Sequence, residues 1–162
     1  MSEPETSGQI TREALDQLRK THIGALFLHA HRTYAARALQ KLHSGGYVDL
    51  TNALSLALAS IDLDGTRLNT LAERLNISKQ AAGQLVDDLQ AKGYLQRAPD
   101  PADGRATSIR FTDKGWRFLE DAHRIKQEIE AEYRAILSEP ELEQLRILLQ
   151  RLTTPSGNSN SG

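Results

Sequence analysis

The feature that most constrains the fold of this chain is a pair of short helical segments joined by a very short turn. Apolar side chains recur at helical spacing on both sides of the turn, at Leu68, Leu71, Ala72 and Leu75 and then at Ala82, Leu85, Val86 and Leu89. Asn76 and Ile77 form the turn, Ser78 is a favourable N-cap for the second helix, and Gly93 ends that helix. This arrangement is typical of a helix-turn-helix.

The segment that follows Gly93 alternates as a β-hairpin does. Tyr94 to Arg97 is predicted as one strand, and Arg105 to Phe111 as the other, because apolar and polar positions alternate along it. The connection, PDPADG at positions 99–104, is rich in turn-forming residues. A hairpin directly behind a helix-turn-helix predicts a winged helix.

Longer helical patterns flank this unit. Residues 11–42 form one continuous pattern that Gly45 and Gly46 end, with a stripe of Leu15, Leu18, His22, Leu26 and His29. A shorter helix follows, with Ala53, Leu54, Ala57, Leu58 and Ile61 on one face. Thr112 caps a predicted helix over about 113–137, with Trp116, Leu119, Ile125, Ile129, Tyr133 and Ile136 as apolar positions. Ser138 and Pro140 begin a last helix, which carries Leu142, Leu145, Leu148, Leu149 and Leu152.

We therefore expect a mostly α fold with a small β-hairpin wing, in which a winged helix-turn-helix domain at 50–115 is flanked by dimerisation helices. The N-terminal helix and its connector occupy 11–49, and the C-terminal helices that complete the dimer interface occupy 116–153. The polar ends, 1–10 and 154–162, are expected to be disordered. A homodimer is expected because a helical chain of 162 residues has a modest core and carries apolar stripes outside the winged domain.

Composition excludes several functions. The chain has no cysteine, which excludes a disulfide framework, a thiol nucleophile, a zinc finger and thiol-based redox sensing. It shows no signal peptide and no apolar run long enough to span a bilayer, so we expect a cytoplasmic protein without membrane contact. The net charge is −1, but residues 66–117 carry a net +3 between acidic flanks. A basic module of this kind is able to bind nucleic acid locally.

The second helix of the helix-turn-helix has a polar outer face. Ser78, Lys79, Gln80 and Gln84 are the candidate DNA contacts there, with Gly83 and Asp87 on the same face. Lysine reaches a guanine edge or a phosphate, and glutamine pairs with adenine in the major groove. Gly83 has no side chain where the helix approaches a DNA backbone. The alternative is an ordinary solvated helix face.

The hairpin adds a second set of candidate DNA contacts. Asp103 and Arg105 are two residues apart at its tip, a spacing at which the carboxylate braces the guanidinium for entry into a minor groove. Arg97 and Arg110, on the strands, complete the candidate set. If Arg105 contacts a base edge, Arg105→Ala weakens specific binding by about 1–3 kcal/mol. The alternative is a surface hairpin with an incidental ion pair.

The stretch from Leu68 to Gly115 resembles the MarR family of bacterial and archaeal transcriptional regulators. The resemblance rests on Ser78-Lys79-Gln80-Ala81, on Asp100-Pro101-x-Asp103-x-Arg105, and on Thr112-x-x-Gly115. It implies a winged-helix homodimer on a pseudo-palindromic operator, with each recognition helix in a major groove and each Arg105 in a flanking minor groove. Ala98 stands where many relatives have a second arginine, and Phe111 where leucine is usual.

The resemblance also implies an effector, because family members often bind an anionic aromatic or lipophilic small molecule between the dimerisation helices and the winged domain. The expected pocket is lined by His22, Leu26, His29, Leu54, Leu58 and Trp116. The alternative for the two histidines, seven residues apart on one face, is an inert place at a helix interface. We expect no metal site and no cofactor.

Three functions are compatible with this pattern. The first is a sequence-specific DNA-binding transcriptional regulator, a homodimeric repressor controlled by a small molecule. The second is a winged-helix protein interaction module, and the third is a small-molecule-binding protein with little DNA affinity. An enzyme is not expected, because the sequence lacks a P-loop, an HExxH motif and a Ser/His/Asp grouping.

Overall fold

The computed structural model describes residues 10–100 and 106–154. Within these ranges the elements are α1 (Arg12–Thr21), α2 (Ile23–Ser44), α3 (Asn52–Ala59), β1 (Thr66–Arg67), α4 (Leu68–Leu75), α5 (Lys79–Ala91), β2 (Leu95–Pro99), β3 (Thr107–Phe111), α6 (Asp113–Arg134) and α7 (Glu139–Thr153). The chain is thus mostly α-helical with one small sheet, and the winged helix-turn-helix fold is confirmed.

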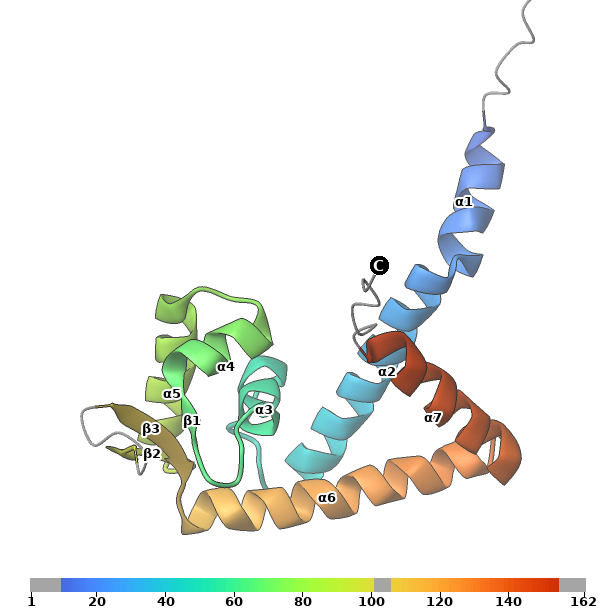
Figure 1. Cartoon of the computed structure of the whole chain (residues 1–162). Coiled ribbons are helices and arrows are strands. Elements are labelled where there is room, and N and C mark those ends of the chain that lie inside the picture. Colours follow the sequence, from blue (N-terminus) through green and yellow to red (C-terminus); the bar gives the residue numbers. More distant parts are fainter. Residues whose placement is uncertain (1–9, 101–105, 155–162) are drawn as a thin grey trace, which may run out of the picture.

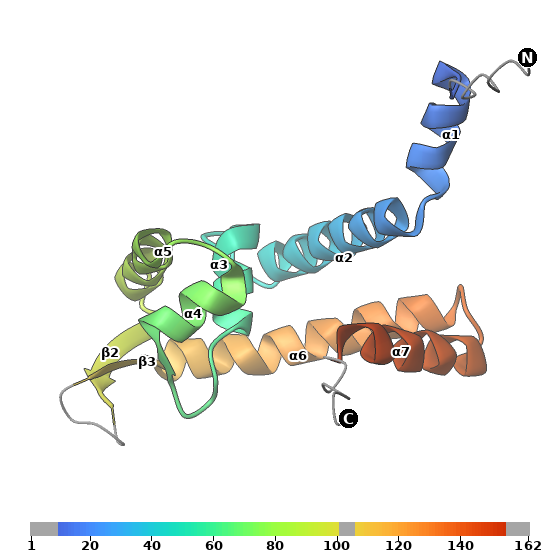
Figure 2. The same ribbon diagram turned by 45° about the horizontal axis from the view of Figure 1, so that its top comes forward.

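The elements form two unequal parts that α6 joins (Figure 1). Helices α3, α4 and α5 and the sheet gather at the beginning of α6, whereas α2 crosses α6 further along and α7 turns back beside its end. Helix α1 projects from the far end of α2, away from the rest of the chain (Figure 2). The core lies mainly in the winged domain, where Leu58, Leu71, Val86 and Leu89 are fully buried.

The predicted helix-turn-helix is confirmed in detail. Asn76 ends α4 in the left-handed conformation, at φ 52°, which asparagine tolerates well. The Ser78 hydroxyl accepts a hydrogen bond from the Ala81 amide at 3.1 Å and so caps α5. Gly93, at φ 79°, follows the end of α5 and turns the chain into the wing.

The predicted hairpin is confirmed as β2 and β3, and a short third strand, β1, extends it to a three-stranded sheet. Its order is β1-β3-β2, antiparallel throughout, and Thr66 of β1 pairs with Ile109 of β3. A strand of two residues carries no alternation, so β1 left no signal in the sequence. The preceding Gly65 has φ 102°, and a β-carbon there would lie 2.4 Å from the Ser108 hydroxyl. Ser108 is buried at this close approach, on the side of β3 opposite Ile109 and Phe111.

The long N-terminal helix is interrupted, which corrects the prediction of one continuous helix. His22 has an extended backbone, with ψ at 136°, and separates α1 from α2. Its imidazole Nδ1 accepts a hydrogen bond from the Gly24 amide at 3.2 Å, so His22 is the N-cap of α2. A side chain that satisfies a free amide favours a new helix start over continuation of the old helix.

Smaller differences concern helix ends. Helix α3 ends at Ala59, so Ile61 lies in the turn after the helix, where it is buried. Ala53, predicted on the apolar face of this helix, is exposed. Helix α6 ends at Arg134, which leaves Ile136 outside the helix and 73% exposed. Phe118, which the periodicity did not single out, is a buried residue of α6.

Candidate nucleic-acid interface

Helix α5 has one buried face and one polar, exposed face. Ala82, Val86 and Leu89 are fully buried against the winged-domain core. On the other side the candidate contacts are all exposed: Ser78, Lys79, Gln80 and Gln84. The structure therefore brings these four predicted residues together on a single surface.

The N-terminus of α5 is suited to a phosphate. The first amides of a helix carry partial positive charge and attract anions. Lys79 stands at the first position of α5 and forms no ion pair with the described part of the chain. No acidic residue occupies the first turn. This end of the helix is therefore positively charged and accessible.

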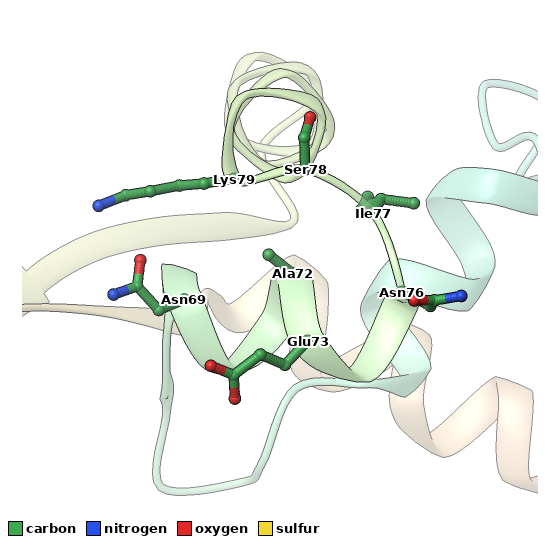
Figure 3. A pocket seen from close by; sticks show the side chains of 7 residues that line it. All are labelled: Asn69, Ala72, Glu73, Asn76, Ile77, Ser78 and Lys79. Atoms are coloured by element: carbon green, nitrogen blue, oxygen red, sulfur yellow. The ribbon is translucent and has the colours of Figure 1, made fainter.

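A shallow depression lies beside this helix end (Figure 3). It is lined by Asn69, Ala72, Glu73, Asn76, Ile77, Ser78 and Lys79. Lys79, Asn69 and Glu73 project to the same side of the turn, from α5 and from α4. The polar surface of α5 thus continues onto α4.

Arg97 of β2 is held by side chains of α5. Its guanidinium is 2.7 Å from the Asp87 carboxylate and donates a hydrogen bond of 2.7 Å to the Gln90 side chain. This contact joins β2 to the C-terminal half of α5. Sequence reasoning missed it because residues 87, 90 and 97 belong to no common local pattern.

A second ion pair fixes the base of the wing. Arg67, at the junction of β1 and α4, lies 2.5 Å from the Asp100 carboxylate. The wing is thus tied to both helices of the helix-turn-helix. Asp103 and Arg105, the predicted tip residues, lie outside the described residues.

Arg110 is separated from the other predicted contacts. It pairs in register with Gln96 and lines a hollow together with Trp116 at the start of α6. The exposed face of α5 does not contribute to that hollow. The structure therefore does not group Arg110 with Lys79, Gln80 and Gln84.

Within one chain, the six residues predicted to line an effector pocket do not come together, and the pocket stays a prediction. Leu54 and Leu58 are 2% and 0% exposed inside the winged-domain core. Leu26 and His29 are exposed on α2, and His22 caps that helix. Trp116 lies at the other end of the molecule, where α6 begins beside the sheet.

Two tyrosines connect the segment after α2 to the winged domain and α6. Tyr94 donates a 2.8 Å hydrogen bond to Asp49, and Tyr47 donates one of 2.6 Å to Asp121. Burial, together with these acceptors, raises the pKa of both phenols, that of Tyr47 to about 12. The hydrogen bond from Tyr47 lowers the pKa of Asp121. These two hydrogen bonds hold the segment after α2 against the winged domain and against α6. Neither hydrogen bond was identified from the sequence.

The comparisons with known proteins agree with this geometry. The family model described as the MarR family matches residues 55–106, a range that contains β1, α4, α5 and β2. The winged domain of this chain is thus similar to that of the MarR family. Members of the MarR family are transcription regulators and not enzymes.

Individual relatives extend the match. The HTH-type transcriptional regulator YdgJ of Bacillus subtilis is 30% identical over 91 residues, 56% of this chain and 54% of that protein. BilQ of Clostridioides difficile is 31% identical over 77 residues, 47% of this chain and 52% of that protein. The chain thus spans about half the length of the curated relatives it matches.

Solved structures cover more of the MarR-family fold. The DNA complex of MepR from S. aureus has a TM-score of 0.65 at 26% identity, and the match covers 82% of this chain and 95% of that one. MepR bound to ethidium bromide matches with a TM-score of 0.56 at 26% identity, over 83% of this chain and 96% of that one. Nearly the whole of MepR is therefore comparable with this chain.

No helix in 10–100 or 106–154 is long and apolar enough to cross a membrane. The same residues contain no cluster of three or more histidine, aspartate or glutamate side chains suited to a metal ion.

Proposed function

We propose that this protein is a sequence-specific, DNA-binding transcriptional regulator of the MarR family that binds a pseudo-palindromic operator as a homodimer. The observation that carries the proposal is the exposed polar face of α5, with Lys79 at its capped start and without an ion pair to any described residue. A protein interaction module would present apolar anchors on such a face. The proposed ligand, chromosomal DNA, places the protein in the cytoplasm.

Each part of the α5 surface has a proposed role in DNA binding. Lys79 and the amides at the start of α5 bind backbone phosphate, since both are positive and accessible. Gln80 and Gln84 lie one turn apart and read base edges in the major groove. Ser78 caps the helix and so orients these groups. Arg97 does not contact DNA in this proposal. It pairs with Asp87 and so holds the wing against α5.

The proposed dimer accounts for a large apolar surface outside the winged domain. The half-exposed or exposed residues are Leu15, Leu18, Ile23, Leu26, Phe27 and Leu28 of the N-terminal helices and Leu145, Ile147, Leu148, Leu149 and Leu152 of α7. Soluble monomers rarely expose so large a contiguous apolar surface. In the proposed dimer a second copy covers the N-terminal helices and α7, and a two-fold axis relates the two chains. The two α5 helices would then face half-sites about one DNA turn apart.

The output we propose is repression that a small anionic aromatic or lipophilic effector modulates. MepR, with its DNA and ethidium bromide structures, is a relative whose fold binds both DNA and a small aromatic molecule. Ethidium is a cation, so the anionic character of the proposed effector rests on the family resemblance alone. In a dimer, Leu26 and His29 of α2 lie on the surface that the second copy covers. An effector that binds there would act on the spacing of the two recognition helices.

The test compares variants of α5 on two duplexes, one carrying a selected site and one a scrambled site. Lys79→Ala is expected to weaken binding to both duplexes and to reduce the slope of log K against log salt by about 0.9, the value of one phosphate contact. Gln84→Ala is expected to weaken only the selected site, by about 1–3 kcal/mol. Gln127→Ala, on the exposed surface of α6, is the matched control. Wild-type affinity in both α5 variants would refute the proposal.

A further inference from the structure

The connector between α2 and α3, residues 45–51, is tied at two points to the rest of the chain. Its Tyr47 donates a hydrogen bond to Asp121 of α6, and its Asp49 accepts one from Tyr94, which lies between α5 and β2. Phe118 of α6 contacts the rings of both tyrosines. We call these five residues the tyrosine clamp. None of them belongs to the α5 surface that is proposed to bind DNA.

The aromatic rings of the tyrosine clamp pack in one defined arrangement. Phe118 meets the Tyr47 ring edge-on at 5.4 Å between centroids and the Tyr94 ring at 5.8 Å. The two tyrosine rings are 6.3 Å apart. Tyr94 and Phe118 are both buried. Because edge-to-face pairs depend on geometry, the rings favour one relative position of the connector, the end of α5 and the start of α6.

Lys114, in the first turn of α6, supports the hydrogen bond between Asp49 and Tyr94. Its ammonium group lies 3.5 Å from the Asp49 carboxylate and 4.0 Å from the centre of the Tyr94 ring. It also donates a 2.8 Å hydrogen bond to the carbonyl of Lys92, the C-cap of α5. A hydrogen bond to a charged group is stronger than one between neutral groups, so the Asp49–Tyr94 contact ties the connector firmly to the end of α5.

The connector is also held on the side of α2. The Tyr47 amide donates a 3.0 Å hydrogen bond to the Leu42 carbonyl in the last turn of α2. One turn earlier, Lys41 forms ion pairs of 3.0 Å with Glu128 and Glu132 of α6. A displacement of α2 is therefore passed to the end of α5 through packed and hydrogen-bonded groups.

We propose that the tyrosine clamp sets the half-site spacing that this protein recognises. The inference rests on the proposed function, a homodimer on an inverted repeat. With α2 in the dimer interface, the clamp fixes the place of each α5 relative to the two-fold axis. One extra base pair between the half-sites moves them apart by about 3.4 Å and rotates them by about 34–36°. A stiff clamp opposes this change and a loosened clamp permits it, so the clamp residues are positioning residues that do not touch DNA.

The first experiment measures the stiffness of the tyrosine clamp without DNA. The chain has no cysteine, so Arg32→Cys on α2 and Glu73→Cys on α4, both at exposed positions, provide two specific sites for spin labels. Subunit exchange with an excess of unlabelled chain confines the measured distance to one chain. Double electron-electron resonance is expected to give a narrow distance distribution with the clamp intact and a broader one with Tyr94→Phe. Equal widths would overturn the proposal.

The second experiment measures the preference for spacing on DNA. The duplexes are the inverted repeat that the wild type selects, the same repeat with one extra central base pair, and a single half-site. Tyr94→Phe is expected to reduce the preference for the selected spacing by about threefold or more, with unchanged affinity for the single half-site. Asp49→Asn keeps an oxygen acceptor for the Tyr94 hydroxyl and should retain the preference, whereas Asp49→Ala should lose it.

Two controls separate positioning from stability. Ile129→Val removes a methylene group from a fully buried side chain of α6 and so lowers stability outside the tyrosine clamp. Tyr133→Phe removes a hydroxyl that donates no hydrogen bond to a described residue. Both controls should keep the distance distribution and the spacing preference of the wild type.

The outcomes distinguish this proposal from the proposed function. An unchanged spacing preference in a folded Tyr94→Phe variant, or an equal loss of preference in Ile129→Val, would overturn the role of the clamp in spacing. A wild type that selects no sequence would refute the proposed function and the role in spacing with it. The distance measurement contains no DNA, so it decides in either case whether the clamp holds the winged domain against α2.

Discussion

Gly83 and Gly115 both lie inside helices, but the packing of the chain requires only one of them. A β-carbon at Gly83 would meet only the Leu68 side chain, at 4.0 Å, which is an ordinary contact. Gly83 is nevertheless a poor residue for the middle of α5, since glycine costs a helix about 0.5–1 kcal/mol relative to alanine. The proposed DNA interface supplies a reason for Gly83, which lies between Gln80 and Gln84 in α5.

Gly83→Ala is therefore expected to separate stability from function. The free energy of unfolding should rise by about 0.5–1 kcal/mol, because alanine is the better helix former. Under the proposed DNA binding, affinity for the selected duplex should fall, because the added methyl group would then stand between α5 and the DNA. Urea unfolding and DNA titration of the same preparation measure both quantities. A more stable variant with unchanged affinity would show that Gly83 has no role at the interface.

Tyr47 gives the stability of the protein a dependence on alkaline pH. Its folded pKa is raised to about 12, by burial first and then by the hydrogen bond to Asp121, whereas an unfolded tyrosine titrates near ~10. A raised folded pKa means that the contribution is complete below pH ~10 and is lost as the pH rises toward about 12.

Tyr47→Phe removes this hydrogen bond and its titration. At neutral pH the variant should be less stable by about 0.5–1.5 kcal/mol. Between pH 9 and pH 12 the stability of wild type should fall more steeply than that of the variant, as measured by urea unfolding at each pH. Parallel curves for the two proteins would contradict the assignment.

Among the elements, the start of α6 shows how a short motif controls the packing of the wing. The Thr112 hydroxyl accepts a 3.1 Å hydrogen bond from the Gly115 amide and donates to the Gly93 carbonyl at 2.6 Å. A β-carbon at Gly115 would lie 2.2 Å from the Tyr94 carbonyl oxygen. The Thr112-x-x-Gly115 motif thus lets the start of α6 lie close to Gly93 and Tyr94, between α5 and β2.

Gly115→Ala should separate α6 from the wing. The clash is with backbone, which cannot rotate away, so we expect a loss of stability of about 1–3 kcal/mol or more. Thermal unfolding of Gly115→Ala beside Gly83→Ala is the informative comparison, since both substitutions add one methyl group to a helix. A Gly115→Ala variant as stable as wild type would show that the close approach is not required.

The elements also show what the sequence could predict. Helix α5, its cap and its exposed face follow from spacing and capping within a few residues, and these predictions of structure hold. Strand β1 and the break at His22 depend on a partner strand and on one imidazole hydrogen bond, for which periodicity has no signal. The ties of Arg97 to Asp87 and of Arg67 to Asp100 are tertiary contacts, so sequence reasoning named Arg97, Asp87 and Asp100 but could not pair them, and it did not single out Arg67.

At the scale of the whole molecule, the main feature is the exposed apolar surface of α1, α2 and α7, which the proposed dimer would bury. Leu148 and Leu149 of α7 are 45% and 40% exposed, whereas a stable core buries such residues. Leu56, on α3, is 51% exposed but belongs to the winged domain. The proposed dimer predicts that these positions respond differently to a charge.

Leu149→Glu should therefore break the dimer, because it places a carboxylate in an apolar interface. Light scattering at micromolar concentration is expected to give a dimer for wild type and for the control Leu56→Glu, and a monomer for Leu149→Glu. A wild-type protein that is monomeric at this concentration, or a Leu149→Glu variant that remains a full dimer, would contradict the assignment of α7 to the interface.

Selection of bound duplexes from a random DNA library, at near-physiological salt, tests the central claim most directly. We expect enrichment of an inverted repeat whose half-sites lie about one helical turn apart, since a two-fold dimer presents two α5 helices to adjacent major grooves. Enrichment of no sequence, with only weak binding that salt abolishes, would contradict sequence-specific recognition by this protein.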